Sequence, residues 1–99
     1  MNFPDMTVNG ILIKQETQVA ALRLFLKNES RQARSLETFL EDLGVPVYHG
    51  YTPRLEKPVA MRAADRLIQK ARKAGIIRFF AGRWINDRAA DAFLRGSST

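Results

Sequence analysis

The side chains that most often carry out catalysis or bind metals are scarce in this chain. His49 is the only histidine, cysteine is absent, and no acidic residue lies close to His49 in the sequence. A zinc site needs several His or Cys ligands, and an activated nucleophile needs a base beside it. Neither a GxxxxGK(S/T) nor a GxGxxG phosphate-binding motif occurs. We therefore expect no enzyme, no cofactor and no metal site, and interpret His49 as a loop residue.

Basic residues give a stronger chemical signal, because they are unevenly distributed. The chain has 16 basic and 10 acidic residues and a net charge of +6. Residues 1–53 hold five basic and six acidic residues, whereas residues 54–99 hold eleven and four. A basic surface speeds association with phosphate polymers and makes the affinity salt-dependent, without itself giving sequence specificity. The acidic trio in the first half is interpreted as a solvated helix face: Glu37, Glu41 and Asp42.

The basic residues are densest in a helix predicted over residues 58–74, which begins at Pro58 and ends before Gly75. At about 100° per residue, one side of this helix is cationic and the opposite side apolar. The cationic side holds Arg62, Arg66, Gln69, Lys70 and Lys73, with Arg72 at one flank. The apolar side holds Ala60, Ala64, Leu67, Ile68, Ala71 and Ala74. Solvated helix faces usually mix both signs, but Asp65 is the only acid here, so we expect a surface that binds a polyanion.

Residues 76–86 predict a β-hairpin, because two short runs of β-branched and aromatic residues surround a two-residue Ala-Gly turn. Alternation places Ile77 and Phe79 on one face. The other face holds Ile76, Arg78 and Phe80. We expect Phe79 and Trp84 to pack in the core, and stacking on a base or sugar is the alternative for Trp84.

The rest of the chain must position this helix and hairpin. The expected elements are an irregular lead-in over 1–10, a short strand over 11–14, a helix from Gln15 to about Asn28, a helix over about 31–43, a connector over 44–57, a short helix over 87–95 and a tail over 96–99. Side chains expected to cap the helices are Thr17 for the first, Ser30 or Ser35 for the second and Asp87 for the last.

These elements predict a single domain, residues 1–99, of α+β class and mostly α. Three helices form its core, followed by a C-terminal β-hairpin and a short final helix. The longest apolar runs are too short for a membrane span, and MNFPDMTVNG does not read as a secretory signal. With no cysteine in the chain, we expect a cytoplasmic protein.

Three segments of the basic half resemble the second half of a winged helix-turn-helix domain: AMRAADRLI at 60–68, KAGIIR at 73–78 and GRWI at 82–85. The resemblance covers about 30 residues, from 57 to 86, and is moderately specific. It implies a small DNA-binding regulator of transcription whose third helix enters the major groove, with the hairpin as the wing. The 14-residue connector at 44–57 departs from the short turn usual in that family.

The resemblance also implies roles for individual residues. The residues that would contact bases or flanking phosphates are Arg62, Arg66, Gln69 and Lys73. Those that would contact phosphates are Lys57, Lys70 and Arg72. On the hairpin, Arg78 and Arg83 would contact the DNA backbone or the adjacent minor groove. Arg and Gln suit these roles because they pair bidentately with guanine and adenine edges. A two-fold dimer would read a palindromic site.

Three alternatives stay open. Residues 87–95, with Phe93 and Leu94, are the candidate dimer element, although simple packing over the core is favoured for them. RNA is the second possible ligand, because a cationic helix beside an aromatic hairpin is not specific for DNA. A protein-interaction adaptor is the third, with the acidic second helix as its docking face.

Overall fold

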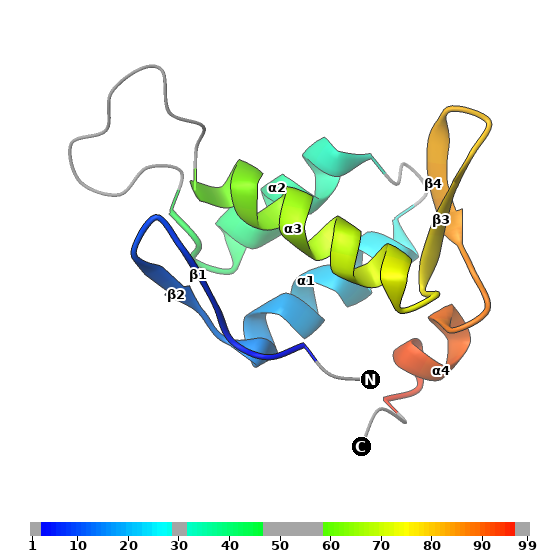
Figure 1. Ribbon diagram of the computed structural model, residues 1–99, viewed down its shortest axis with the longest axis horizontal. Helices are drawn as coiled ribbons and strands as arrows, with labels where there is room; N and C mark the ends of the chain where they lie inside the picture. The colour runs from blue at the N-terminus through cyan, green and yellow to red at the C-terminus, as the bar shows by residue number, and fades with distance from the viewer. Residues whose placement is uncertain (1–2, 29–31, 47–58, 97–99) are drawn as a thin grey trace.

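Three packed helices form the centre of the protein, and a β-hairpin lies at each end of the third helix (Figure 1). The computed structural model describes residues 3–28, 32–46 and 59–96. Its elements in chain order are β1 (Met6–Val8), β2 (Ile11–Ile13), α1 (Gln15–Lys27), α2 (Ala33–Asp42), α3 (Val59–Lys73), β3 (Ile77–Phe80), β4 (Arg83–Asn86) and α4 (Ala90–Leu94). This architecture confirms the predicted fold class, which is α+β, mostly α, with a C-terminal hairpin and a short final helix.

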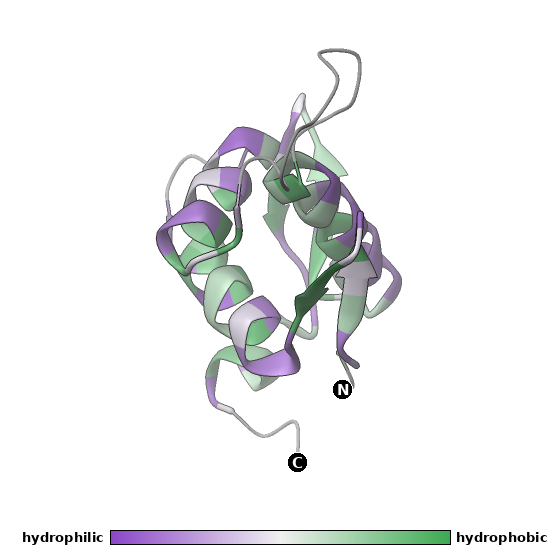
Figure 2. Ribbon diagram, turned by 90° about the vertical axis from the view of Figure 1, so that its left-hand side faces the viewer, coloured by the Kyte–Doolittle hydropathy of each residue, from purple (hydrophilic) through white to green (hydrophobic). Residues whose placement is uncertain are grey.

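The core lies between the inner faces of α1, α2 and α3. Its largest helical contributors are buried: Leu22, Phe25 and Leu26 of α1, Leu36 and Leu40 of α2, and Leu67 and Ile68 of α3. Hydrophilic and hydrophobic residues alternate along the helices in Figure 2, as expected for helices with one buried face. Small residues on α3, Ala60, Ala64 and Ala71, are also fully buried and let the helices approach closely. Among the described helices, none is long and apolar enough to cross a membrane.

The lead-in over residues 1–10 is not irregular throughout, which corrects the sequence-based expectation. Residues Met6–Val8 form β1, which pairs antiparallel with β2 in the register Met6 to Ile13 and Val8 to Ile11. Asn9 and Gly10 form the two-residue turn, with φ of 50° and 81°. Such a turn suits an Asn-Gly pair, because both residues tolerate positive φ. The strand predicted over residues 11–14 is confirmed as β2.

The capping side chains predicted for three helices are wrong. Lys14, not Thr17, occupies the N-cap position of α1. Its backbone carbonyl accepts the first hydrogen bonds of the helix, from the N–H groups of Thr17 and Gln18, and its side chain makes no capping bond. Gln32 occupies the N-cap position of α2, so Ser35 lies inside the helix. Ser30 lies outside the described residues. Ala89, not Asp87, occupies the N-cap position of α4, which is shorter than predicted. The backbone carbonyl of Asp87 accepts a hydrogen bond from the N–H of Ala90.

Asp5, from the segment before β1, provides the missing cap of α1. Its Oδ1 accepts a hydrogen bond of 2.8 Å from the backbone N–H of Gln15, the first residue of the helix. We expect Asp5→Ala to lower the free energy of unfolding by about 1 kcal/mol, the usual effect of losing a helix cap. Asp5→Asn keeps an acceptor oxygen and should lose much less. Urea denaturation measures both, and equal stabilities of Asp5→Ala and the wild type would show that this bond does not stabilise α1.

The C-terminal end of α3 turns directly into the second hairpin. Gly75 has φ of +76°, the N–H of Gly75 bonds to the carbonyl of Arg72, and the N–H of Ile76 bonds to the carbonyl of Ala71. This pair of bonds forms a Schellman cap, which requires a residue in the left-handed conformation. The predicted glycine cap is therefore confirmed, and β3 begins only two residues after it.

Candidate nucleic-acid interface

The solvent-exposed side of α3 is a narrow stripe of long polar side chains. Its exposed members are Asp65, Arg66, Gln69, Arg72 and Lys73. They recur every three or four residues, so they share one side of the helix. Asp65 is the only acid in this helix. The Nε of Arg72 donates a hydrogen bond of 3.1 Å to Oε1 of Gln69, which aligns these two side chains along the stripe.

Two cations that the sequence places in the same stripe turn toward the protein instead. Lys70 is half-buried, and its ammonium lies 3.8 Å from Sδ of Met6 on β1 and 3.5 Å from Oε1 of Gln18 on α1. Arg62 is also half-buried, and its enclosed Nε has no hydrogen-bond partner among the residues that the structure describes. A helical wheel cannot distinguish these positions, because the neighbour that attracts Lys70 is β1, which was not predicted.

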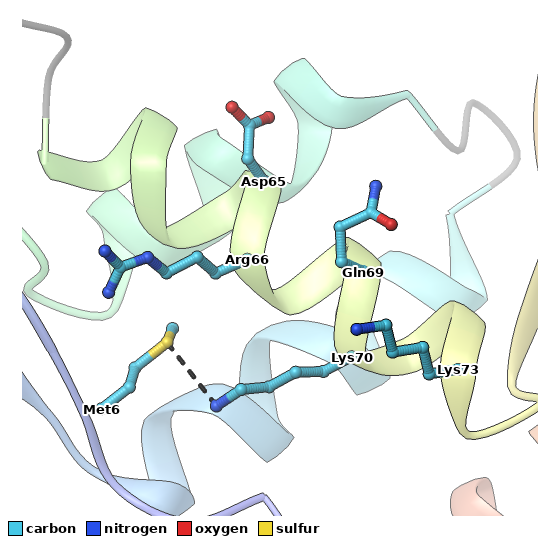
Figure 3. Close-up of a pocket in the computed structure, with 6 residues that line it drawn as sticks. All are labelled: Met6, Asp65, Arg66, Gln69, Lys70 and Lys73. Atoms are coloured by element: carbon cyan, nitrogen blue, oxygen red, sulfur yellow. Dashed lines mark hydrogen bonds between the residues drawn. The ribbon is translucent and has the colours of Figure 1, made fainter.

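An open pocket of about 400 Å³ separates α3 from β1 (Figure 3). It is lined by Met6, Asp65, Arg66, Gln69, Lys70 and Lys73. At its edge, Nη1 of Arg66 donates a hydrogen bond of 2.9 Å to the carbonyl oxygen of Thr7, so the hairpin orients this guanidinium. In Figure 3, Lys70 extends toward Met6, whereas Asp65 and Gln69 point away from it. Three cations and one carboxylate, Asp65, line this hollow, so its net charge is positive and suits a phosphate group.

The β3–β4 hairpin, which follows α3, adds two exposed arginines, Arg78 near its base and Arg83 near its tip. Its register pairs Arg78 with Ile85 and Phe80 with Arg83, and Ala81 and Gly82 form the turn at φ of 52° and 81°. The predicted hairpin and its two-residue turn are therefore confirmed. Arg78 makes an exposed ion pair of 3.9 Å with Asp87, which at such exposure holds the guanidinium only weakly. We call Arg66, Gln69, Arg72, Lys73, Arg78 and Arg83 the cationic face.

The aromatic side chains of this hairpin divide between the core and solvent. Phe79 was expected in the core, but 59% of its surface is exposed, because the hairpin projects beyond the helices and only its base is buried. Ile76 and Ile77 fill that base. Trp84 is half-buried and packs against the core, which agrees with the role preferred from the sequence. It also meets Phe79 edge-to-face, with 5.1 Å between the ring centroids.

The final helix packs over the core. Phe93 is buried, contacts Phe3 edge-to-face at 5.8 Å between centroids, and lies under the guanidinium of Arg23 at 5.9 Å. A side chain enclosed in this way is unavailable to a second copy of the chain, and Leu94 is half-buried against the same core. The packing role favoured from the sequence therefore fits α4 better than the dimer element.

Two predicted residues cannot be placed. Lys57, expected to bind phosphate, and His49, expected in a loop, both lie outside the described residues, as does most of the connector at 44–57. Within the described ranges, no group of three His, Cys, Asp or Glu side chains is arranged to hold a metal ion.

Sequence reasoning missed the residues that join the N-terminal hairpin to α3. Gln18 is fully buried, and its Nε2 donates hydrogen bonds to the carbonyls of Pro4 (2.9 Å) and Ile13 (3.1 Å). A glutamine one turn before Leu22 interrupts an apolar stripe, and this is a detectable signal of a buried polar contact. Apolar residues on both sides of Asn9-Gly10, at the matching positions 6, 8, 11 and 13, similarly indicated the hairpin.

Comparison of the chain with protein-family models, curated proteins and solved structures gives no match. A functional assignment therefore depends on the residues and geometry described above.

Proposed function

We propose that the protein binds nucleic acid, and double-stranded DNA in particular, through the cationic face. The observation that carries this proposal is the composition of the exposed side of α3, where three cations and one glutamine accompany a single acid. Two exposed arginines of β3–β4 extend the charge beyond the end of the helix. Ordinary folding requires no such accumulation of one sign, because like charges on neighbouring turns repel.

The dimensions of α3 suit a groove of duplex DNA. A 15-residue helix is about 22 Å long and about 10–12 Å wide with its side chains, and the major groove is about 12 Å wide. Gln69, Lys73 and Arg72 lie along the exposed stripe, where they can reach base edges and phosphates. In this proposal Arg66, at the pocket beside β1, binds a flanking phosphate. Lys70 would support this surface from inside rather than contact the DNA.

The arrangement supports a regulator of the winged helix-turn-helix class as the specific form of the proposal. Three helices followed by a hairpin, with the cations on the third helix and on the hairpin, are the order and charge distribution expected of such a protein. The protein-adaptor alternative is less favoured, because Glu37 and Glu41 on α2 are half-buried and only Asp42 is exposed. An acidic docking face would need its carboxylates in solvent.

Fluorescence anisotropy with a labelled duplex of random sequence tests this proposal. We expect binding at low salt and an affinity that falls about 100-fold between about 50 and 200 mM monovalent salt, the loss expected when about four phosphates are neutralised. Unlabelled duplex RNA and unlabelled duplex DNA serve as competitors, and the DNA should displace the probe at a lower concentration than the RNA. No binding of the duplex at low salt would overturn the proposed function.

A further inference from the structure

Phe80 lies beside the tip of the β3–β4 hairpin, with 58% of its surface in solvent. Alternation along the strands places it on the same face as Arg78, two residues earlier, and Arg83, its partner across the hairpin. The guanidinium of Arg78 lies over the Phe80 ring, 5.4 Å from its centroid. An exposed aromatic ring therefore shares one face of the hairpin with two exposed arginines.

Folding does not explain this ring. Ile77 anchors the base of the hairpin in the core, and the contact between Phe79 and Trp84 joins the two strands on the opposite face. Phe80 is not among the buried residues or the partly buried residues packed against them. Phe79 and Phe80, neighbours in β3, are both exposed, and exposed apolar surface rimmed by charged residues is a usual mark of a binding surface.

We propose that Phe80, with Arg78 and Arg83, is a stacking site for an unpaired base, so that the protein prefers a duplex bearing a single-stranded extension over a blunt duplex. This inference rests on the proposed function and names the kind of nucleic acid. Aromatic rings bind unpaired bases by stacking, and adjacent arginines bind the phosphates of the same strand. A protein partner is less favoured, because both sides of the ring carry positive charge that continues the cationic face.

Substitutions at Phe80 separate stacking from general apolar contact. Phe80→Leu keeps an apolar side chain but removes the aromatic face, whereas Phe80→Trp keeps the aromatic face. Leu12 on β2, with 57% of its surface exposed, is the matched control, because Leu12→Ala removes an equally exposed apolar side chain from the other hairpin. The probes are a blunt DNA duplex and the same duplex with a single-stranded extension, measured by fluorescence anisotropy with circular dichroism to verify folding.

We expect the wild type to bind the extended duplex more tightly than the blunt one. Phe80→Leu should weaken binding to the extended duplex about tenfold, the effect of losing one stacked base, and leave blunt-duplex binding nearly unchanged. Phe80→Trp and Leu12→Ala should both behave as the wild type. Fluorescence of Trp84, the only tryptophan, should change when the extended duplex binds and provides a second readout on the same hairpin.

Three results would overturn the inference. Equal affinities of Phe80→Leu and the wild type for the extended duplex, with duplex binding intact, would remove the stacking site while leaving the proposed function standing. A wild-type dimer that Phe80→Leu converts to a monomer, without change in DNA affinity, would assign the ring to a protein contact. Absence of binding to both probes would overturn the proposed function and this inference with it.

Discussion

Reversal of charge at Lys73 and Arg83 should weaken duplex DNA binding by about 100-fold or more. Both side chains are exposed, one on α3 and one near the tip of the β3–β4 hairpin. Lys73→Glu combined with Arg83→Glu replaces two attractive contacts to phosphates by two repulsive ones, and juxtaposed like charges cost several kcal/mol, where each ~1.4 kcal/mol is tenfold in affinity. Fluorescence anisotropy at low salt measures the change, with circular dichroism to show that the variant is folded.

The control for this prediction must alter the net charge equally at another place. Lys14 and Lys27 lie at the two ends of α1 and are exposed. Lys14→Glu combined with Lys27→Glu lowers the net charge by the same amount, so a general field effect would weaken binding in both double variants. We expect only a small loss in the control. Equal losses in the two double variants would mean that α3 and the hairpin do not form the contact surface.

Gln18→Leu should destabilise the protein more strongly than the loss of a helix cap or of an exposed side chain. Gln18 is fully buried, and its amide bonds to the carbonyls of Pro4 and Ile13 and accepts from Lys70. Leucine leaves the Ile13 carbonyl without its partner in the interior, where an unsatisfied group costs about 1–3 kcal/mol, and it also removes the part-buried contacts to Pro4 and Lys70. We expect the free energy of unfolding to fall by about 3 kcal/mol, which for a domain of this size corresponds to about 15 °C in Tm.

The exposed residue Gln15 on the same helix gives the matched control. Gln15→Leu makes the same chemical change in solvent and should alter stability by less than about 0.5 kcal/mol. Urea denaturation followed by circular dichroism compares the two variants. If Gln18→Leu were as stable as Gln15→Leu, the amide of Gln18 would not be the link between the N-terminal hairpin, α1 and α3.

The helices were predictable because their apolar residues recur with a clear period. Leu36, Leu40 and Leu67 occupy the positions that periodicity assigns to the core, and all are fully buried. The glycine that ends α3 and the turn at residues 81–82 were predictable because positive φ favours a few residue types. Strand β1 was missed because its three residues, Met6–Val8, are not a continuous apolar run like that of β2, although the apolar positions on both sides of Asn9-Gly10 match those of a hairpin.

The cationic stripe was predictable, but the direction of each long side chain was not. A helical wheel treats Lys70 and Lys73 alike, and only the packing of β1 and α1 against α3 turns Lys70 inward. Helix caps failed for a related reason: Asp5, ten residues away in sequence, satisfies the start of α1 through a tertiary contact. Phe79 was wrongly predicted in the core, and the exposure of Phe80 was not predicted. Alternation gives the face of a strand on which a residue lies, but not how far the hairpin projects from the core.

The most direct test of the central claim is the slope of log K against log salt concentration for duplex binding, compared between the wild type and Lys73→Gln with Arg83→Gln. Each phosphate contact contributes about one unit to this slope. If the cationic face binds DNA, neutralising these two residues should reduce the magnitude of the slope by about two units. A slope unchanged from that of the wild type would contradict the claim that α3 and the β3–β4 hairpin contact the phosphate backbone.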